Sequence, residues 1–316
     1  MFAKRAHTME TLRDFTFLQS RLASGRPRKA VALACPHDSH TEYVIERALR
    51  EGFARFTLAT CRPLSAHLAA VAEANSAWVR VIACADAAEA SRRAVAEVRQ
   101  GRAGVLMKGT VNTDVLLHAV LDKRAGLLEP GRVMTHIAVA HIPAFPRLLV
   151  FSDAAVIPRP SLEQFDAIVR ACAASCRRLG VAKPKIALTH CTEKVSPRFE
   201  NTLYYMELKR RAERGDYGSA VVDGPMDVKT ALDAESAAIK GIHSPVAGQA
   251  DVLVFPNIEA GNTFYKTVTL LAGVTVAGWL TGTVVPIVVA SRADSEQSKF
   301  FSLALACVGG GDADQR

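Results

Sequence analysis

The chain has 316 residues, of which 49% are hydrophobic. That is enough for a sizeable core and suggests two domains of ordinary size. Charged residues make up 22% and no segment is strongly biased, which excludes a largely disordered protein. The formal net charge of +8 favours phosphate-bearing partners, but no basic run carries interleaved aromatic residues, so we expect no nucleic-acid partner.

Apolar runs of strand length alternate with amphipathic helical stretches along most of the chain. The predicted strands are Ala30–Ala34, Val79–Ala83, Lys185–Thr189, Ala220–Asp223, Asp251–Phe255 and Val285–Ala290. The predicted helices include Glu42–Glu51, Ala87–Gln100 and Ser161–Leu179. Ser161 and Gln164 form a capping-box pattern, and Gly180 supplies a C-terminal stop. This alternation indicates an α/β protein with parallel sheets flanked by helices.

The stretch from Thr267 to Ser291 contains no charged residue and is long enough to span a bilayer. Glycines and Pro286 interrupt it, and its end is β-branched. We therefore expect a buried helix, a turn and a buried strand here, with no membrane partner. The N-terminus carries no secretory signal pattern, so the sequence predicts a cytoplasmic protein.

The cysteines are scattered, odd in number and without C-x-x-C spacing, which suits buried thiols in a reducing compartment. They are Cys35, Cys61, Cys84, Cys172, Cys176, Cys191 and Cys307. A zinc site could be drawn from the helix pair Cys172 and Cys176 with His190-Cys191. Both helix cysteines fall on the apolar stripe, however, so we expect core thiols and no metal.

Polar and glycine residues gather at three strand exits, where open α/β sheets bind ligands. These exits are Asp223-Gly224-Pro225, the segment from Pro256 to Thr263, and Ser291 to Ser295. At the second exit we expect Gly261-Asn262-Thr263 to open a helix with Asn262 as N-cap. The free N–H groups there would form an anion site, and Lys266 would add charge. An ordinary capped helix with a surface lysine is the alternative.

The exit at Ser291-Arg292 has a sharper chemical meaning. A guanidinium at a strand end suits bidentate phosphate recognition, and an adjacent hydroxyl can donate to an oxyanion. The alternative is that Arg292 pairs with Asp294 while the serine caps the next helix. Dinucleotide, P-loop, nucleophile-elbow and H-E-x-x-H motifs are absent from the sequence, which disfavours redox, nucleotide-hydrolysis and esterase chemistry.

Several stretches together resemble the phosphate acetyltransferase/phosphate butyryltransferase family. They are LMKGTVNTD (Leu106–Asp114), SDAA (Ser152–Ala155), VDGP (Val222–Pro225), KGIHSPVAGQADVLVFPNIEAGNTFYK (Lys240–Lys266) and SRADSEQSKFFSLALA (Ser291–Ala306). The matching stretches occur in the order typical of the family, from about Leu106 to Ala306. Their amino-acid sequences are closer to the butyryl branch of the family.

The resemblance implies a two-domain α/β protein of the isocitrate/isopropylmalate-dehydrogenase-like fold. The first domain would contain residues 1–133 and 287–316 and the second residues 134–286, with the active site in the cleft between them. The resemblance also implies a homodimer without metal or redox cofactor. Its substrates would be acyl-CoA, inorganic phosphate and acyl phosphate, with the coenzyme A thiolate attacking the acyl carbonyl directly.

The same resemblance suggests roles for individual residues. Ser291 would stabilise the oxyanion or thiolate, and Arg292 would hold phosphate. Asp294 or, as the alternative, Glu296 would stand in for the base. The substrate-binding set would be Gly261, Asn262, Thr263, Lys266, Asp223, Gly224, Lys108 and His118.

The chain departs from the family pattern at a few positions. Lys229, His118, Ile157 and Ser298 stand where an aspartate, an arginine, an asparagine and an aspartate are usual. Two alternatives therefore stay beside the acyltransferase: a non-catalytic paralogue that binds coenzyme A or phosphate, and a metal-dependent decarboxylating dehydrogenase of similar fold. The dehydrogenase would need clustered aspartates, which the sequence does not show.

Overall fold

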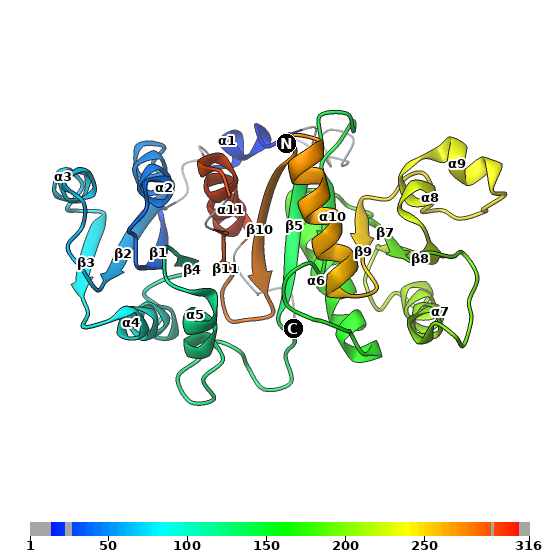
Figure 1. Ribbon diagram of the computed structural model, residues 1–316, viewed down its shortest axis with the longest axis horizontal. Helices are drawn as coiled ribbons and strands as arrows, with labels where there is room; N and C mark the ends of the chain where they lie inside the picture. The colour runs from blue at the N-terminus through cyan, green and yellow to red at the C-terminus, as the bar shows by residue number, and fades with distance from the viewer. Residues whose placement is uncertain (1–13, 23–26, 292–293, 310–316) are drawn as a thin grey trace, which may run out of the picture. The chain divides into compact units, whose positions relative to one another are not determined.

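The computed structural model describes residues 14–22, 27–291 and 294–309 (Figure 1). The chain forms two compact units. Of the described residues, the split unit contains those within Phe15–Met134 and from Ala277 to Gly309. The other unit contains Asp14 and Thr135–Val276, and it is called the continuous unit because all but one of its described residues form a single segment. In both units strands alternate with helices. The predicted α/β class, with mostly parallel strands flanked by helices, is confirmed.

The strands of the split unit follow the order β3-β2-β1-β4-β11-β10. Their bounds are β1 Lys29–Ala34, β2 Ala54–Thr60, β3 Val79–Ala83, β4 Val105–Lys108, β11 Ile287–Val288 and β10 Thr275–Thr281, most of which belongs to this unit. β10 runs antiparallel to β11, and the other pairs are parallel. The parallel pairs bring the carboxyl ends of β1, β2, β4 and β11 to one edge.

Helices cover both faces of these strands. Their bounds are α1 Phe17–Leu22, α2 Ser39–Arg50, α3 Ala66–Ala74, α4 Ala87–Arg99, α5 Thr113–Val120 and α11 Glu296–Gly309. α4 packs on β1 and β2 and contacts α5, whereas α11 contacts α1 and α2. In Figure 1, α4 and α5 lie on one side of the strands, and α2 and α11 lie on the other.

The continuous unit has the strand order β5-β6-β9-β7-β8. Its strands are β5 Thr135–His141, β6 Leu149–Ser152, β7 Lys185–Thr189, β8 Val221–Met226 and β9 Val252–Val254. β5 and β6 are antiparallel, and the remaining pairs are parallel. Its helices are α6 Leu162–Leu179, α7 Glu200–Glu213, α8 Val228–Leu232, α9 Ala234–Ile239 and α10 Ile258–Leu271.

Two long helices cover opposite faces of β6. Phe151 meets Phe264 of α10, with ring centroids 5.4 Å apart, while its neighbour Ser152 hydrogen-bonds to Cys172 of α6. Successive side chains of a strand point to opposite faces, so α6 and α10 sandwich this strand. Cys172 and Cys176 are fully buried on α6, which confirms the prediction of core thiols on that helix.

The local signals at α6 are confirmed in detail. The Ser161 side chain accepts from the Gln164 N–H, and the Gln164 side chain accepts from the Ser161 N–H. Gly180 ends the helix with φ +103°, a left-handed conformation that glycine adopts without steric cost. The capping box at the start of α6 and the left-handed glycine after its end therefore bound the same helix that the apolar stripe predicts.

The start of α10 corrects one prediction. The helix begins at Ile258, and the Asn257 side chain is the N-cap because it accepts from the Ala260 N–H at 2.8 Å. Asn262 therefore lies inside the helix, and its expected role as N-cap is wrong. The exit Asp223-Gly224-Pro225 is also not beyond a strand, because β8 continues through it to Met226.

The uncharged stretch from Thr267 to Ser291 contains the end of α10 and two strands. α10 ends at Leu271, after which the chain forms β10 and then β11. The predicted strand Val285–Ala290 is shorter in the structure, at Ile287–Val288, and β10 was not predicted, because a helix, a turn and a single strand were expected here. The expected burial of the helix is wrong, since Leu270 and Leu271 at the end of α10 are exposed. Within the described residues, no helix has the length and apolar character that crossing a membrane requires.

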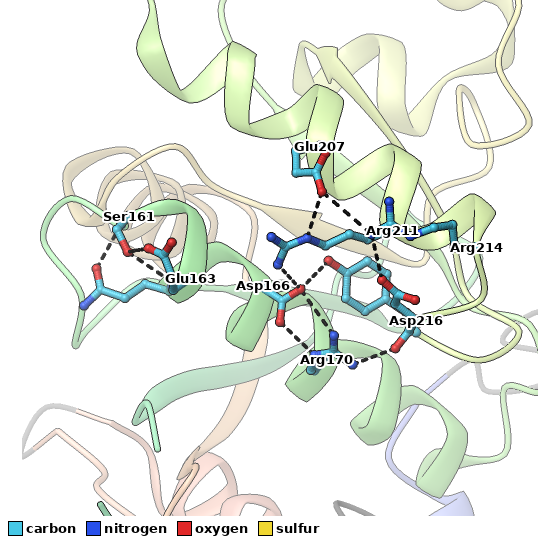
Figure 2. A network of polar contacts seen from close by, with 10 residues as sticks. Ser161, Glu163, Asp166, Arg170, Glu207, Arg211, Arg214 and Asp216 are labelled. Atoms are coloured by element: carbon cyan, nitrogen blue, oxygen red, sulfur yellow. Dashed lines mark hydrogen bonds and ion pairs between the residues drawn. The ribbon is translucent and has the colours of Figure 1, made fainter. Parts of the chain in front are cut away.

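A network of charges joins α6 to α7 (Figure 2). Asp166 accepts from Arg170 of its own helix at 2.7 Å and from Arg211 of α7 at 2.9 Å. The hydroxyl of the buried Tyr217 also donates to Asp166, at 2.8 Å. Burial alone would raise the pKa of Asp166, but the hydrogen bonds from Arg170, Arg211 and Tyr217 together lower it.

We expect Asp166→Asn to lower the free energy of unfolding of the protein by about 1–3 kcal/mol near neutral pH, because it removes the charge that three donors share. A carboxylate with a lowered native pKa stabilises the fold above its unfolded pKa of about 3.9 and loses that effect as the pH falls through the native value. Urea unfolding should therefore show a smaller difference in the free energy of unfolding between wild type and Asp166→Asn at acidic pH than at neutral pH.

Asp216→Asn is the matched control, since Asp216 pairs at 3.1 Å with the exposed Arg214. Exposed pairs contribute about 0–1 kcal/mol, so this variant should unfold almost as the wild type does. Equal losses for the two variants would contradict a special role for Asp166.

Candidate active site

The residues predicted for the site are shared between the two units. Lys108, His118, Ser291 and Asp294 belong to the split unit. Asp223, Gly224, Gly261, Asn262, Thr263 and Lys266 belong to the continuous unit. Arg292 lies outside the described residues.

Ser291 sits in a tight turn after β11. Its N–H donates to Asp294 Oδ2 at 2.7 Å, and the Asp294 N–H donates back to the Ser291 carbonyl at 3.2 Å. The Asp294 carbonyl contacts His40 Nδ1 at 3.1 Å. The Ser291 side chain is exposed, so this turn presents a hydroxyl at the carboxyl edge of the split unit. One oxygen of Asp294 is meanwhile committed to the turn itself.

A partly buried ion pair anchors the helix that follows this turn. Lys299 of α11 is 5% exposed, and its Nζ donates to Asp38 Oδ1 at 2.9 Å. Asp38 is also the N-cap of α2, accepting from the backbone and hydroxyl of Thr41. Burial would raise the pKa of Asp38, but the bonds from Thr41 and Lys299 lower it. The Asp38 carboxylate thus caps α2 and also holds Lys299 near the start of α11.

Neither residue of this pair was proposed from sequence. Asp38 sits just before a predicted helix, which is a local N-cap signal. Lys299, in contrast, is 261 residues away along the chain, and no sequence period connects the two.

Lys108 is buried at the end of β4, and part of its hydrogen bonding lies within its own loop. Its Nζ donates to the Gly109 and Val111 carbonyls, both at 3.2 Å. Gly109 lies so close to β1 that an added Cβ would stand 2.1 Å from the Cys35 carbonyl oxygen. Lys108 therefore stabilises the β4–α5 loop, and its contact with a ligand stays a prediction.

His118 is exposed on α5 and lines a cavity of about 650 Å³. Arg92 and Arg99 of α4 line the same cavity from the neighbouring helix. The cavity lining contains none of the other residues predicted for the site. His118 therefore shares this cavity with neither Ser291 nor Lys108, and its place in the site stays a prediction.

In the continuous unit, Asp223 and Gly224 lie inside β8. Asp223 is 6% exposed and pairs with Lys209 Nζ at 2.8 Å, while its Oδ1 also accepts the Gly224 N–H at 2.9 Å. Gly224 has φ +154°, and an added Cβ would stand 2.4 Å from the Leu188 carbonyl. Only glycine fits between these strands at that conformation.

Gly261 and Asn262 dock α10 onto the loop that follows β6. A Cβ at Gly261 would meet the Asp153 carbonyl oxygen at 2.1 Å, and Asn262 Nδ2 donates to the Ala154 carbonyl at 3.1 Å. Thr263 and Lys266 are exposed on the same helix. The Lys266 ammonium stands 4.2 Å from the centre of the Tyr265 ring.

The loop that receives α10 is itself held by a buried carboxylate. Asp153 is 2% exposed and accepts from the N–H groups of Ala155 and Val156 at 2.7 and 2.9 Å. Its other oxygen accepts from the Thr135 hydroxyl at 2.8 Å and from the His136 N–H at 3.1 Å. The structure thereby gives a role to the SDAA motif, for which sequence reasoning had proposed none.

The comparisons with known proteins agree with this architecture. A family model described as "Phosphate acetyl/butaryl transferase" matches residues 66–307. The phosphate acetyltransferase of Thermotoga maritima is 36% identical over 289 residues, which cover 91% of this chain and 97% of that protein.

The chain belongs to the phosphate acetyl/butyryltransferase family. The predicted family and acyltransferase class are confirmed. The phosphate butyryltransferase of Clostridium acetobutylicum is 39% identical over 224 residues, or 71% of this chain and 74% of that protein. Acetyl and butyryl enzymes thus match at similar identity, and the closer likeness to the butyryl branch stays a prediction.

Among solved structures, a branched-chain phosphotransacylase from Enterococcus faecalis superposes with a TM-score of 0.78 at 29% identity. The match covers 89% of this chain and 98% of that one. A phosphotransacetylase from Staphylococcus aureus, at 17% identity and a TM-score of 0.73, shares the fold.

Ile157 and Lys229, two of the positions where the resemblance implies a departure from the family pattern, lie in different surroundings. Ile157 is 5% exposed and belongs to the core, whereas Lys229 is exposed on α8. Asp227, which caps α8, pairs with Lys240. Burial opposes ionisation of Asp227, but its hydrogen bonds, that from Lys240 first, lower its pKa to about 2. Asp227 thus lies two residues before Lys229 in the sequence, but its carboxylate pairs with Lys240.

We expect Lys299→Met to cost about 1–3 kcal/mol of stability, because Asp38 loses a charged donor in a partly buried setting. It should also lower kcat/KM, since the helix that follows the Ser291 turn loses its anchor. Urea unfolding and acyl-transfer kinetics of Lys299→Met, Asp38→Asn and the double variant would measure this. The double variant should lose less stability than the sum of the single losses.

Lys123→Met is the control, because Lys123 is exposed in the same unit. It should behave as the wild type in both measurements. Strict additivity of the two losses at Asp38 and Lys299 would contradict the pairing.

Proposed function

We propose that this enzyme transfers an acetyl or short acyl group reversibly between coenzyme A and inorganic phosphate. The observation that carries the proposal is family membership along almost the whole chain, 97% of the Thermotoga maritima phosphate acetyltransferase being matched. The exposed Ser291 hydroxyl at a strand end supports it, since acyl transfer needs a donor beside the reacting carbonyl.

In the direction from acyl phosphate, the coenzyme A thiol first loses its proton, because the thiolate is the nucleophile. The thiolate attacks the acyl carbon, a C–S bond forms and the carbonyl oxygen becomes an oxyanion. The oxyanion then collapses, the C–O bond to phosphorus breaks, and phosphate leaves with the bonding pair. In the reverse direction a phosphate oxygen attacks the thioester and the thiolate leaves.

Three residues of the Ser291 turn have proposed roles in these steps. The Ser291 hydroxyl donates to the developing oxyanion, and Arg292 holds phosphate by a bidentate contact. Asp294 takes the thiol proton on its carboxylate. The backbone turn keeps Ser291 and Asp294 in a fixed relation.

The continuous unit would supply the remaining binding groups. We propose that Thr263 and Lys266, on the exposed side of α10, contact the phosphate-bearing substrates, with Gly261 and Asn262 fixing that helix. Asp223 and Gly224 would line the site from β8, and Lys108 and His118 from the split unit. The site would then lie in a cleft between the domains, as expected for an isocitrate/isopropylmalate-dehydrogenase-like protein.

We further propose a cytoplasmic homodimer that needs no cofactor beyond its coenzyme A substrate. Leu270 and Leu271 at the end of α10 are 82% and 77% exposed, and Ile239 is 78% exposed. Apolar side chains this exposed favour a covered face in the assembly. The described cysteines are free thiols, which suits a reducing compartment.

The reaction is tested by thiol release from acetyl-, propionyl-, butyryl- and longer acyl-CoA with and without phosphate. We expect release that depends on phosphate, and the chain with the highest kcat/KM identifies the substrate. Neighbouring chain lengths should differ by only about 10–200-fold, because a methylene contributes about 1–3 kcal/mol to discrimination. A folded protein that releases no thiol from any acyl-CoA would overturn the enzyme and leave a binding paralogue.

Arg292→Ala should lower kcat/KM for phosphate by about 10²–10³-fold, the usual cost of losing one preorganised donor at a developing charge. Arg93→Ala is the matched control, because Arg93 is exposed and pairs with Glu89 within α4. In steady-state assays with phosphate varied, Arg93→Ala should have the same kcat/KM as the wild type. Near-normal kinetics of Arg292→Ala would remove Arg292 from the site.

A further inference from the structure

Two cysteines that are 26 residues apart in sequence meet at the carboxyl edge of the split unit. Cys35 follows β1 and Cys61 follows β2, and these neighbouring strands are parallel, with Ala34 paired to Ala59. The Cys35 N–H continues the ladder by donating to the Ala59 carbonyl at 2.8 Å. The two sulfur atoms consequently lie 3.9 Å apart.

His37 adds a nitrogen donor to the two sulfurs. One ring nitrogen of His37 and the sulfurs of Cys35 and Cys61 all lie within 4.8 Å of one another. Tetrahedral zinc binds cysteine sulfur at about 2.3 Å, so two thiolates on one zinc ion stand about 3.8 Å apart. The observed separation of 3.9 Å already has that spacing, whereas a disulfide would require about 2.05 Å.

The backbone of Cys35 is in the left-handed region, which a residue with a side chain rarely adopts. Among the described residues, Cys35 is the only non-glycine residue with positive φ, at +58°. Its carbonyl accepts from the N–H and hydroxyl of Thr110 at 2.8 and 3.1 Å and from the His37 N–H at 3.0 Å. Backbone in this region costs free energy and persists where surrounding contacts fix it, often at functional sites.

Hydrogen bonds also orient the His37 ring. Its Nε2 lies 3.2 Å from Thr60 Oγ1, and that hydroxyl donates its hydrogen to the Arg62 carbonyl. Thr60 can therefore only accept from Nε2, which leaves the neutral ring with its lone pair on Nδ1. A ligating histidine usually has its other ring nitrogen held in this way by an outer partner.

We propose that Cys35, His37 and Cys61 form a binding site for Zn²⁺, a use that neither the family comparison nor the acyl-transfer mechanism assigns to them. Two sulfurs and an imidazole are the donors that zinc prefers, and three protein ligands leave the fourth position for water. Cys35 is buried, while Cys61 and His37 are partly exposed, so the ion has a path from solvent. Sequence reasoning expected no metal because Cys172 and Cys176 fall on an apolar stripe and because the family resemblance implies none.

Zinc at this site would stabilise the loop between β1 and α2. His37 is followed directly by Asp38, the N-cap of α2 and the partner of Lys299. Tying His37 to two strand ends therefore fixes the residue on which α2 and α11 both depend. We expect zinc to raise the thermal unfolding temperature of the protein.

The test is Co²⁺ and Zn²⁺ binding to the reduced full-length protein. Co²⁺ should bind with thiolate-to-metal charge-transfer absorption and with the visible bands of a tetrahedral site, and about one equivalent of Zn²⁺ should displace it. Cys61→Ser, Cys35→Ser and His37→Gln should each weaken Zn²⁺ binding by more than about 100-fold, since losing even an outer partner costs about 10–100-fold. The zinc-dependent rise in unfolding temperature should disappear with them.

Cys191→Ser is the matched control. Cys191 is an exposed thiol whose sulfur lies 3.5 Å from His190 Nδ1, a two-donor Cys–His pair in the continuous unit. Its loss should leave the cobalt spectrum and the zinc affinity unchanged. Because Cys61 and His37 are partly exposed, their variants are expected to fold even if Cys35→Ser does not, and circular dichroism checks this.

Three outcomes would overturn the proposal. The reduced wild type could bind Co²⁺ without thiolate absorption, or the absorption could survive in Cys61→Ser and His37→Gln. Alternatively, mass spectrometry after mild oxidation could find Cys35 joined to Cys61 in a protein that binds no metal when reduced, which would make the pair a disulfide switch. These readouts need no turnover, so they stand apart from any failure of the acyltransferase assay.

Discussion

Parallel strand pairing is the constraint on which the sites of this protein depend. In the split unit β2, β1, β4 and β11 are neighbours in that order and run the same way. The residues that follow these strands must therefore arrive at one edge, whatever their separation in the sequence. Cys61, Cys35, Gly109 and Ser291 are brought to that edge by this rule alone.

Pairing brings the strand ends together, but buried charges hold the loops beyond them. The Asp153 carboxylate accepts from four donors, two in β5 and two in its own loop. Gly261 of α10 packs against this loop. Lys299 and Asp38 do the same for α2 and α11. Each buried donor left without its acceptor would cost about 1–3 kcal/mol, so these carboxylates make the loop conformations specific.

The sequence predicts an element correctly where the residues that determine its bounds all lie within that element. The capping box of α6 and the strands Val79–Ala83 and Lys185–Thr189 were predicted with their observed bounds, because cap, periodicity and composition act within one element. The start of α10 was missed since two asparagines could cap it, and only the fold decides that Asn257 accepts from Ala260. Periodicity also could not separate β10 from the helix before it, as both are apolar.

The contacts that make the candidate sites were harder to predict because they join distant segments. Cys35 and Cys61 were interpreted as ordinary buried thiols, and nothing in their spacing indicates that their sulfurs meet. Cys191 was expected to be buried with the others and is exposed. The bonds from Lys108 to the Gly109 and Val111 carbonyls likewise depend on the loop conformation, which the sequence alone does not reveal.

Strand order also limits how the proposed zinc site can affect acyl transfer. β4 lies between β1 and β11, and neighbouring strands are about 4.8 Å apart. The strands that precede Cys35 and Ser291 therefore lie about 10 Å apart, whereas an ion polarises a carbonyl through a direct bond of about 2 Å. The route that remains is mechanical. Zinc would fix His37, His37 adjoins Asp38, and Asp38 holds Lys299 at the start of the helix that follows the Ser291 turn.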